Sequence, residues 1–270
     1  GAYNATSLLV KDPIDLERKF LLLLNLKPSE YSTQMVEPEY LLRLLLEMNI
    51  AFGVIANLAD DLRHLQRTEI DELRELFTNT QVGSSTMPQK RNPWNSEHVK
   101  SLWKAFFPRV MTFYMDQISE HQRDMSNSAS SRFVADYISG FTAAIARMNK
   151  IVTTIRVDRK RLIANITLKG DLVLAEAAYV LLSLSGDTNA HEKIRKITLE
   201  CEKSGGRLVD ALQKDSDLWG YISARLESTT GEDAEEFFSN PWKYCGKAVE
   251  KTRALVDKYS HKMNTLKEIL

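Results

Sequence analysis

Cysteine is scarce in this chain, and its scarcity limits the classes of protein to consider. Cys201 and Cys245 are the two cysteines among 270 residues, too few for the disulfide framework of a small secreted domain. We therefore expect reduced thiols and a cytoplasmic protein. No uninterrupted apolar run reaches the length of a membrane-spanning helix, and no segment resembles a signal peptide, so we expect no membrane partner.

An excess of charge of either sign is also missing. The chain carries 36 Lys and Arg against 36 Asp and Glu, a formal net charge of zero. A balanced charge gives no general reason to expect a nucleic acid or a membrane surface as partner. With 43% hydrophobic residues, the chain is long enough to fold around a sizeable core, in one large domain or in one large and one small domain.

Strand patterns are weak, whereas helical spacing is strong. Between Pro38 and Gln66, apolar residues recur at alternating spacings of three and four, which predicts a long helix with proline in its first turn. The stripe that this helix is expected to bury contains Leu41, Leu44, Met48, Ala51, Ile55, Leu58, Leu62 and Leu65. A stripe of this length exceeds what one domain needs, so helices of other subunits are expected to pack on it as well.

Further helical segments complete the predicted fold. They cover residues 70–77, 96–117 with a kink at Pro108, 133–155, and 170–184. These segments predict an all-α fold. We expect a bundle of long helices within residues 1–160, and the remainder of the bundle with a small helical C-terminal domain within residues 161–270.

The stretch GSSTMPQKRNPWNSE, residues 83–97, combines turn-forming residues with reactive and charged ones. Glycine, serine, proline and asparagine are common in turns, so a plain linker between helices is one interpretation. The whole string, however, resembles the Gly-Ser-Ser-x-Met-Pro-x-Lys-x-Asn-Pro signature of the fumarase/aspartase superfamily, which includes adenylosuccinate lyase and argininosuccinate lyase. The resemblance implies a long-helix bundle of that type and a β-elimination that releases fumarate, without metal or cofactor.

The resemblance also implies roles for individual residues of this stretch. Ser84 matches the superfamily's catalytic base. A serine hydroxyl is a poor base in water, so it needs a closed, dry loop whose hydrogen-bond donors favour the alkoxide. Lys90 and Asn92 match the positions that hold the substrate carboxylates. Met87 matches a residue that lines the substrate pocket, and Ser85 is expected to add a hydrogen bond.

Two other segments are similar to adenylosuccinate lyases in particular. Gln34, in Ser32-Thr33-Gln34, matches a glutamine that contacts substrate. The segment RDMSNSASSR, residues 123–132, matches an Arg-Asp-x-x-x-Ser-x-x-x-Arg motif that binds the nucleotide phosphate, here through Arg123, Ser128 and Arg132. Arginine binds phosphate oxygens in bidentate fashion, and a helix start favours an anion. A capping serine cluster with surface arginines is the alternative interpretation.

Two departures from the family pattern leave alternatives open. Gln89 stands where adenylosuccinate lyases usually have histidine, and glutamine there is more typical of argininosuccinate lyase. The family's N-terminal third, which carries the histidine proposed as general acid, has no counterpart in this chain. His64, His98 and His121 match no acid motif, so we expect this chain alone to lack a complete site.

The resemblance implies that the intact protein cleaves a small-molecule nucleotide substrate. The leading hypothesis is adenylosuccinate lyase activity, which gives fumarate and AMP from adenylosuccinate. The same family also cleaves the succinylated aminoimidazole carboxamide ribotide of purine biosynthesis, so the hypothesis includes this second substrate. The resemblance further implies a homotetramer with shared active sites. The alternatives are a sibling lyase (argininosuccinate lyase or carboxymuconate cycloisomerase) and an inactive helical scaffold that serves in assembly.

Overall fold

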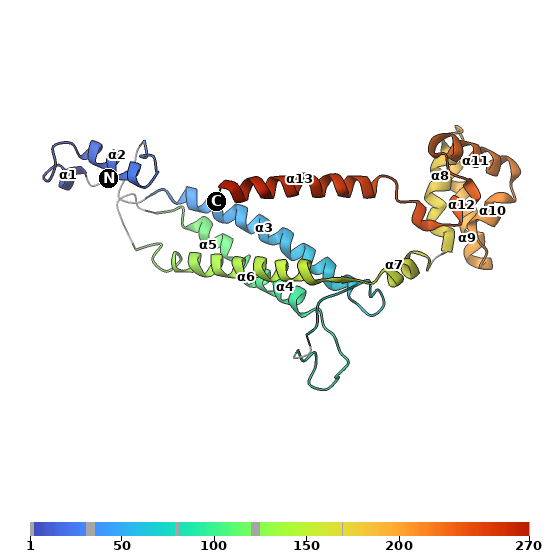
Figure 1. Ribbon diagram of the computed structural model, residues 1–270, viewed down its shortest axis with the longest axis horizontal. Coiled ribbons are helices and arrows are strands. Elements are labelled where there is room, and N and C mark those ends of the chain that lie inside the picture. The colour runs from blue at the N-terminus through green and yellow to red at the C-terminus, as the bar shows by residue number, and fades with distance from the viewer. Residues whose placement is uncertain (1–2, 31–35, 79–80, 120–124, 169, 270) are drawn as a thin grey trace. The chain divides into compact units, whose positions relative to one another are not determined.

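The computed structural model describes residues 3–30, 36–78, 81–119, 125–168 and 170–269, which are mostly helical (Figure 1). The chain divides into two compact units, residues 1–158 and 159–270. In the part of the chain that is described, the strands are two residues long each. The prediction of an all-α fold is confirmed.

The first unit contains the long helices. Its described elements are α1 (Tyr3–Thr6), α2 (Pro13–Leu23), α3 (Pro38–Leu65), β1 (Leu73–Arg74), α4 (Trp94–Phe106), α5 (Arg109–Met115), α6 (Arg132–Thr154) and β2 (Arg156–Val157). β1 and β2 pair antiparallel, with Leu73 opposite Val157 and Arg74 opposite Arg156.

Proline marks two of these boundaries, and one expected helix is wrong. α3 starts at Pro38, and where a kink within one helix was expected at Pro108 the chain breaks into two helices, α4 and α5. The helix expected over residues 70–77 does not form. Asp71 has a left-handed backbone conformation (φ 51°), which does not fit a right-handed helix, and the chain then enters β1.

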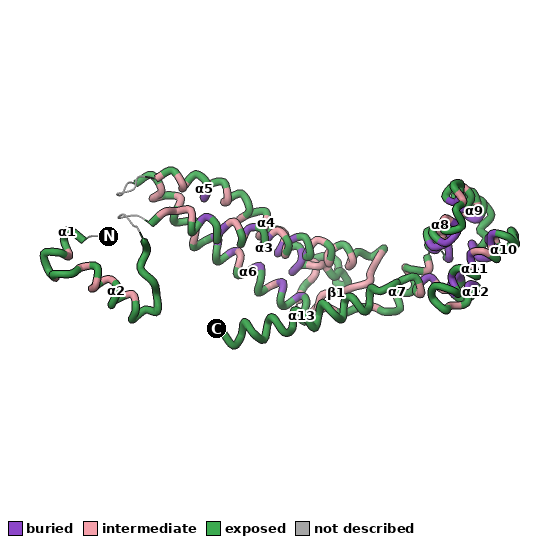
Figure 2. Tube along the Cα trace, turned by 90° about the horizontal axis from the view of Figure 1, so that it is seen from above, coloured by how far each residue is buried: buried purple, intermediate pink, exposed green. Residues whose placement is uncertain are grey.

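The core of the first unit lies where α3 packs against α4 and α6. Phe52 and Ala59 of α3, Val99 of α4, and Ala144 and Ile151 of α6 are buried together. Figure 2 shows buried positions along these helices on the sides that face one another, with exposed positions on the outer sides. The three helices therefore share one buried layer of side chains.

α3 buries a different stripe from the one predicted. Its buried residues are Leu42, Leu45, Asn49, Phe52, Ala56 and Ala59. Leu41, Leu44 and Leu58, which belong to the predicted stripe, are exposed. The prediction is displaced by one residue, about 100° around the helix, because α3 is apolar on both stripes. Met48, Ile55 and Leu62 of the predicted stripe still pack partly against the cores, so its exposed residues alone face away from α4 and α6.

Because apolar residues lie on two stripes of α3, the helix as a whole is strongly hydrophobic. Among the described helices, α3 is long and apolar enough to cross a membrane, judged by length and composition only. The expectation that no segment reaches that length is wrong by this measure, because it considered only uninterrupted apolar runs. Within the structure, 28% of the relevant window of α3 is buried, on the side that faces α4 and α6.

Two contacts set the close approach of α6 to its neighbours. A Cβ atom at Gly140 would lie 2.2 Å from the ring of Phe106, so glycine lets α4 and α6 pack closely. The buried hydroxyl of Tyr137 donates a hydrogen bond of 3.1 Å to Asn49 Oδ1. Burial raises the pKa of Tyr137 to about 12, so the hydroxyl keeps its proton and this bond near neutral pH. The pair fixes α6 along α3.

The second unit has its own core. Its described elements are α7 (Arg159–Ile166), η1 (Gly170–Leu174), α8 (Ala175–Ser183), α9 (Ala190–Ser204), α10 (Leu208–Gln213), α11 (Ser216–Thr230), α12 (Ala234–Phe238), η2 (Pro241–Lys243) and α13 (Ala248–Ile269). Leu174, Leu212, Ile222 and Phe238 are fully buried in its core. The Asp171 carboxylate is also buried and accepts hydrogen bonds from the backbone N–H groups of Leu208 and Val209, at 2.8 and 2.9 Å.

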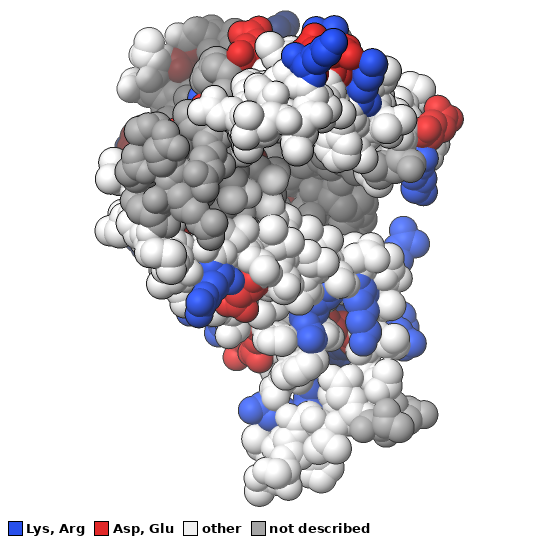
Figure 3. Space-filling view, turned by 90° about the vertical axis from the view of Figure 1, so that its left-hand side faces the viewer, with Lys and Arg blue, Asp and Glu red and all other residues white. Residues whose placement is uncertain are grey.

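Much of the surface is uncharged. Most of the face drawn in Figure 3 is uncharged, and several of the small groups of Lys and Arg there lie beside Asp and Glu. Large apolar side chains are exposed on α3, including Ile50 and Val54, and on α13, including Val256 and Tyr259. Such exposed apolar side chains on long helices are typical of surfaces that other helices cover.

Asp60 of α3 joins α3 to α4 through an ion pair. Lys100 Nζ of α4 lies 2.7 Å from Asp60 Oδ2, and Arg63 donates to Asp60 Oδ1 from Nε (2.9 Å) and Nη2 (2.8 Å). The hydrogen bonds from Lys100 and then from Arg63 lower the pKa of Asp60 to about 2.

We expect Asp60→Asn to lower the free energy of unfolding at about pH 7 by about 0.5–1 kcal/mol, because it removes a partly exposed ion pair. A carboxyl whose pKa is lowered contributes stability above its ordinary pKa of 3.8 and loses that contribution as the pH falls toward 2. Denaturant titrations of both proteins at about pH 7 and about pH 2.5 measure the difference. Asp61→Asn, at the exposed neighbouring position, is the matched control. An Asp60→Asn effect of equal size at both pH values would contradict this account.

Candidate active site

The loop between β1 and α4 carries the predicted base. Ser84 is partly buried, and its Oγ accepts hydrogen bonds from the backbone N–H groups of Thr86 (3.2 Å) and Met87 (3.1 Å). Two donors directed at one hydroxyl oxygen favour the deprotonated form, because an alkoxide accepts stronger hydrogen bonds than an alcohol. The residues that follow Ser84, from 85 to 90, are exposed, so within a single chain the loop supplies these two donors but not the closed, dry surroundings that a serine base needs.

Contacts between its two limbs give the loop a defined shape. Asn92 Nδ2 donates to the carbonyl oxygen of Gly83 at 3.0 Å and so joins the two limbs, and within the turn between them the Lys90 N–H donates to Met87 O at 3.0 Å. Gly83 touches the returning limb so closely that an added Cβ would lie 1.9 Å from Lys90 O. Asn92, which the resemblance places on a substrate carboxylate, thus uses one amide hydrogen to hold the loop together.

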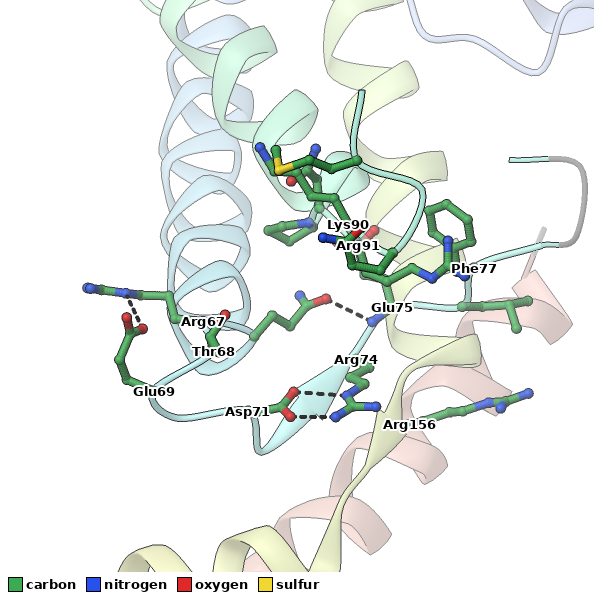
Figure 4. A pocket seen from close by; sticks show the side chains of 16 residues that line it. Arg67, Thr68, Glu69, Asp71, Arg74, Glu75, Phe77, Lys90, Arg91 and Arg156 are labelled. Carbon is green, nitrogen blue, oxygen red and sulfur yellow. Dashed lines mark hydrogen bonds and ion pairs between the residues drawn. The ribbon is translucent and has the colours of Figure 1, made fainter. Parts of the chain in front are cut away.

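A cavity of about 830 Å³ opens beside this loop (Figure 4). Of the residues predicted to bind substrate, Met87, Lys90 and Asn92 line the cavity. Ser84 and Ser85 are described but are not among its lining residues. The loop therefore places three predicted binding residues around one space and leaves the predicted base next to it.

Positive charge predominates in the lining of this cavity. Its charged lining residues are Arg67, Arg74, Lys90, Arg91 and Arg156, with Glu69, Asp71 and Glu75. Two of the arginines are paired within the cavity wall (Figure 4): Arg67 lies 3.6 Å from Glu69, and Arg74 donates from Nε to Asp71 at 2.9 Å. The excess of positive charge suits a substrate that carries carboxylate or phosphate groups.

The described residues of the predicted phosphate motif lie at the start of α6. Arg132 is the first residue of α6 and is exposed, and Ser128 is partly buried in the turn before it. Their neighbours Asn127 and Ser130 make hydrogen bonds to the end of α5. The hydroxyl of Ser130 donates to the carboxylate of Asp116, and Asn127 Nδ2 donates to the carbonyl oxygen of Asp116 at 2.8 Å. This turn is thereby tied to the end of α5.

Among the described residues, a single chain does not bring the Ser84 loop and the predicted phosphate motif together. The Ser84 loop follows β1, which pairs with β2 just beyond the C-terminal end of α6, whereas Ser128 and Arg132 lie at its N-terminal end (Figure 1). α6 has 23 residues, so its ends are about 34 Å apart at 1.5 Å per residue. Gln34 and Arg123, the other predicted site residues, lie outside the described residues.

Two family models match this chain, and each includes one group of the predicted site residues. A family model described as Lyase matches residues 8–105, and one described as Adenylosuccinate lyase C-terminal matches residues 119–233. The first match includes the Ser84 loop, and the second includes Ser128 and Arg132. The chain belongs to the fumarase/aspartase lyase superfamily.

Curated relatives within this superfamily carry a common name. The chain is 27% identical to an adenylosuccinate lyase of Pyrococcus horikoshii over 260 residues, 95% of this chain and 56% of the relative. It is 31% identical to the adenylosuccinate lyase of Thermotoga maritima over 234 residues, 84% of this chain and 52% of the relative. The chain spans about half the length of the curated relatives it matches.

Solved structures of superfamily lyases share the fold. The 3-carboxy-cis,cis-muconate lactonizing enzyme of Pseudomonas putida matches with a TM-score of 0.70 at 23% identity, over 87% of this chain and 51% of that one. A fumarate lyase from Mesorhizobium sp. BNC1 matches with a TM-score of 0.62 at 16% identity, over 78% of this chain and 45% of that one. At these identities the likeness establishes the helical fold alone.

His98 is the histidine that follows the Ser84 loop most closely in the sequence. Burial, and then the charge of Arg147, lower the pKa of His98. The ring is therefore neutral near pH 7 and is a poor proton donor.

The sequence analysis missed the residues that hold the Ser84 loop in place. The Arg91 guanidinium carbon lies 3.9 Å from the centre of the Phe77 ring. Glu75 accepts hydrogen bonds from Asn95 and Ser96, at the far end of the loop. About twenty residues separate Glu75 from these partners, so no local spacing predicts the contact. The sequence signal that could have indicated this contact is the acidic Glu75 before the loop together with the polar Asn95 and Ser96 at the start of the next helix.

We expect Gly83→Ala to open the loop, because the added Cβ would lie 1.9 Å from Lys90 O and must displace the backbone there. The hydrogen bond from the Lys90 N–H to Met87 O should weaken, so amide hydrogen exchange at Lys90 should become at least about tenfold faster. Gly220→Ala is the control, because nothing lies within 4 Å of its added Cβ. Unchanged exchange at Lys90 in Gly83→Ala would show that the two limbs are not in tight contact.

Proposed function

We propose that the intact protein is a lyase that releases fumarate from adenylosuccinate, giving AMP, and from the succinylated aminoimidazole carboxamide ribotide of purine biosynthesis. The observation that carries the proposal is the Ser84 hydroxyl with its two backbone N–H donors, in a loop beside a cationic cavity. The adenylosuccinate lyases of Pyrococcus horikoshii and Thermotoga maritima, which resemble this chain, support the choice of substrate.

The proposed reaction is a β-elimination. The Ser84 alkoxide takes a proton from the carbon beside a substrate carboxylate, and the electron pair of that C–H bond forms the new C=C bond. The bond from the neighbouring carbon to the leaving amine breaks, and a separate acid protonates the amine. Negative charge builds up on the carboxylate during proton removal, and a fixed cation such as Lys90 stabilises it. Fumarate and the free amine are the products.

In this proposal the active site is shared between copies of the chain in a homotetramer. The base of the Ser84 loop contacts Arg147 of α6, about 22 Å along the helix from Arg132, so one nucleotide substrate is not expected to reach both within one chain. Exposed apolar side chains of α3, such as Leu44 and Val54, offer a surface for helices of other copies. Antiparallel packing of a second copy would place its Arg132 beside the first copy's loop.

A second candidate function is that of a sibling lyase whose substrate has no phosphate. Gln89 lines the cavity at a position where adenylosuccinate lyases usually have histidine, and a muconate lactonizing enzyme is among the similar folds. Removing the charge of Arg132 separates the two candidates, because only a phosphate-bearing substrate loses an anion contact.

We expect Ser84→Ala to lower fumarate release from adenylosuccinate by at least about a hundredfold with little change in KM, because it removes the base and leaves the binding residues. Ser85→Ala should cost less, below about tenfold. Ser228→Ala is the control, an exposed serine of the C-terminal unit whose hydroxyl donates to Arg225 O.

The absorbance of fumarate measures each rate. A Ser84→Ala variant with more than about half of the wild-type rate would contradict the role of Ser84 as base. Intact wild-type protein that releases no fumarate would contradict the proposed function and favour an inactive helical scaffold.

A further inference from the structure

A single carboxylate closes the base of the Ser84 loop. Glu75 Oε1 accepts hydrogen bonds from the Ser96 backbone N–H (2.9 Å) and the Ser96 hydroxyl (2.6 Å). Its Oε2 accepts from the Asn95 backbone N–H (3.0 Å) and Asn95 Nδ2 (2.7 Å). Asn95 and Ser96 are buried in the first turn of α4. The carboxylate therefore satisfies N–H groups that the helix leaves unpaired, and its charge lies where the helix dipole favours an anion.

The backbone of Glu75 is held from the other side. Its N–H donates to Gln66 Oε1 at 2.8 Å, and Gln66 Nε2 donates to Leu62 O at 2.9 Å, at the end of α3. β1 ends at Arg74, immediately before Glu75, and is paired with β2. Glu75 is thus anchored to α3 and to the strand pair before its side chain reaches α4.

Asn95 extends the same network to α6. Arg147 Nη1 of α6 donates to Asn95 Oδ1 at 2.9 Å. The guanidinium carbon of Arg147 lies 4.6 Å from the centre of the Trp94 ring, within range of a cation–π contact. Three helices, α3, α4 and α6, therefore meet through Glu75 and Asn95 at the point where the loop leaves and rejoins the bundle.

Two further ties join the limbs of the loop above this base. Arg91 stacks on Phe77, with 3.9 Å between the guanidinium carbon and the ring centre. Asn92 Nδ2 donates to Gly83 O at 3.0 Å, and Ser84 is the next residue. Each tie joins the outgoing limb to the returning limb, so a displacement at the base passes through successive contacts to the Ser84 hydroxyl.

We propose that Glu75 is a positioning residue for the lyase reaction: its carboxylate locks the two ends of the loop together and so holds Ser84 in place. Both carboxylate oxygens are occupied by hydrogen bonds within the protein, so Glu75 acts through the loop and is not itself a base. The kinetic consequence rests on the proposed function, whereas the effect on the loop does not.

The experiment compares Glu75→Gln with a matched substitution in the C-terminal unit. Glutamine keeps one acceptor oxygen but directs an NH₂ group at N–H donors, so contacts on one side of the carboxylate are lost. Asp171→Asn removes a similar carboxylate, which accepts two backbone N–H groups at the start of α10. Both variants should lose stability, but Glu75→Gln alone should disturb the Ser84 loop.

Limited trypsin digestion of the intact protein detects that disturbance, because Lys90 and Arg91 lie in the loop. We expect cleavage after these residues to be at least about tenfold faster in Glu75→Gln than in the wild type or Asp171→Asn, with unchanged helical circular dichroism. The kcat for fumarate release should fall by about 10- to 100-fold, with KM within about threefold, because the base is misplaced while binding residues remain.

Two results would overturn the inference. One is loop cleavage that is no faster in Glu75→Gln than in Asp171→Asn, whatever happens to kcat. The other is faster cleavage with a wild-type kcat. Wild-type protein that releases no fumarate would overturn the proposed function, and the cleavage comparison would still decide whether Glu75 holds the loop. If Glu75→Gln does not fold, Ser96→Ala replaces it. It removes one of the four hydrogen bonds and should move cleavage in the same direction by a smaller factor.

Discussion

The buried contact among α3, α4 and α6 is the constraint on which the candidate site depends. Phe52, Val99 and Ile151 meet in this contact, and Gly140 allows α6 to approach Phe106. The Ser84 loop leaves the bundle after α3 and rejoins it at α4, so the spacing of these helices sets the width of its base. Core packing thereby fixes the two ends of the loop, and hydrogen bonds such as that from Asn92 to Gly83 hold the residues between them.

The length of α6, in contrast, keeps two groups of predicted site residues apart within one chain. Along α6, a helix of 23 residues, Arg132 lies about 22 Å from Arg147, which contacts the base of the Ser84 loop. In the proposed lyase, each end of the bundle would contribute part of a site: the cationic cavity beside the Ser84 loop at one end, and Ser128 with Arg132 at the other. The exposed apolar residues of α3 supply a surface through which copies could join the two parts.

Local signals made much of the fold predictable. Proline placed the start of α3 and the break before Arg109, and a regular apolar period located α6. The stripe that α3 buries was not predictable, because two adjacent stripes are apolar and only the partner helices decide between them. The motif pointed to Ser84, but contacts between distant residues, such as Glu75 with Ser96, leave no pattern in the sequence. The separation of Ser84 from Arg132 likewise follows only from the packed helices.

The claim that one site is built from several copies of the chain is tested most directly by mixing two inactive variants of the intact protein. Ser84→Ala and Arg132→Ala are each purified, unfolded, mixed and refolded together, and fumarate release from adenylosuccinate is measured. The account predicts that the mixture recovers at least about a tenth of the wild-type rate, because some mixed sites combine an intact loop with an intact Arg132. A mixture no more active than either variant alone would show that the two residues act within one chain or not in one site.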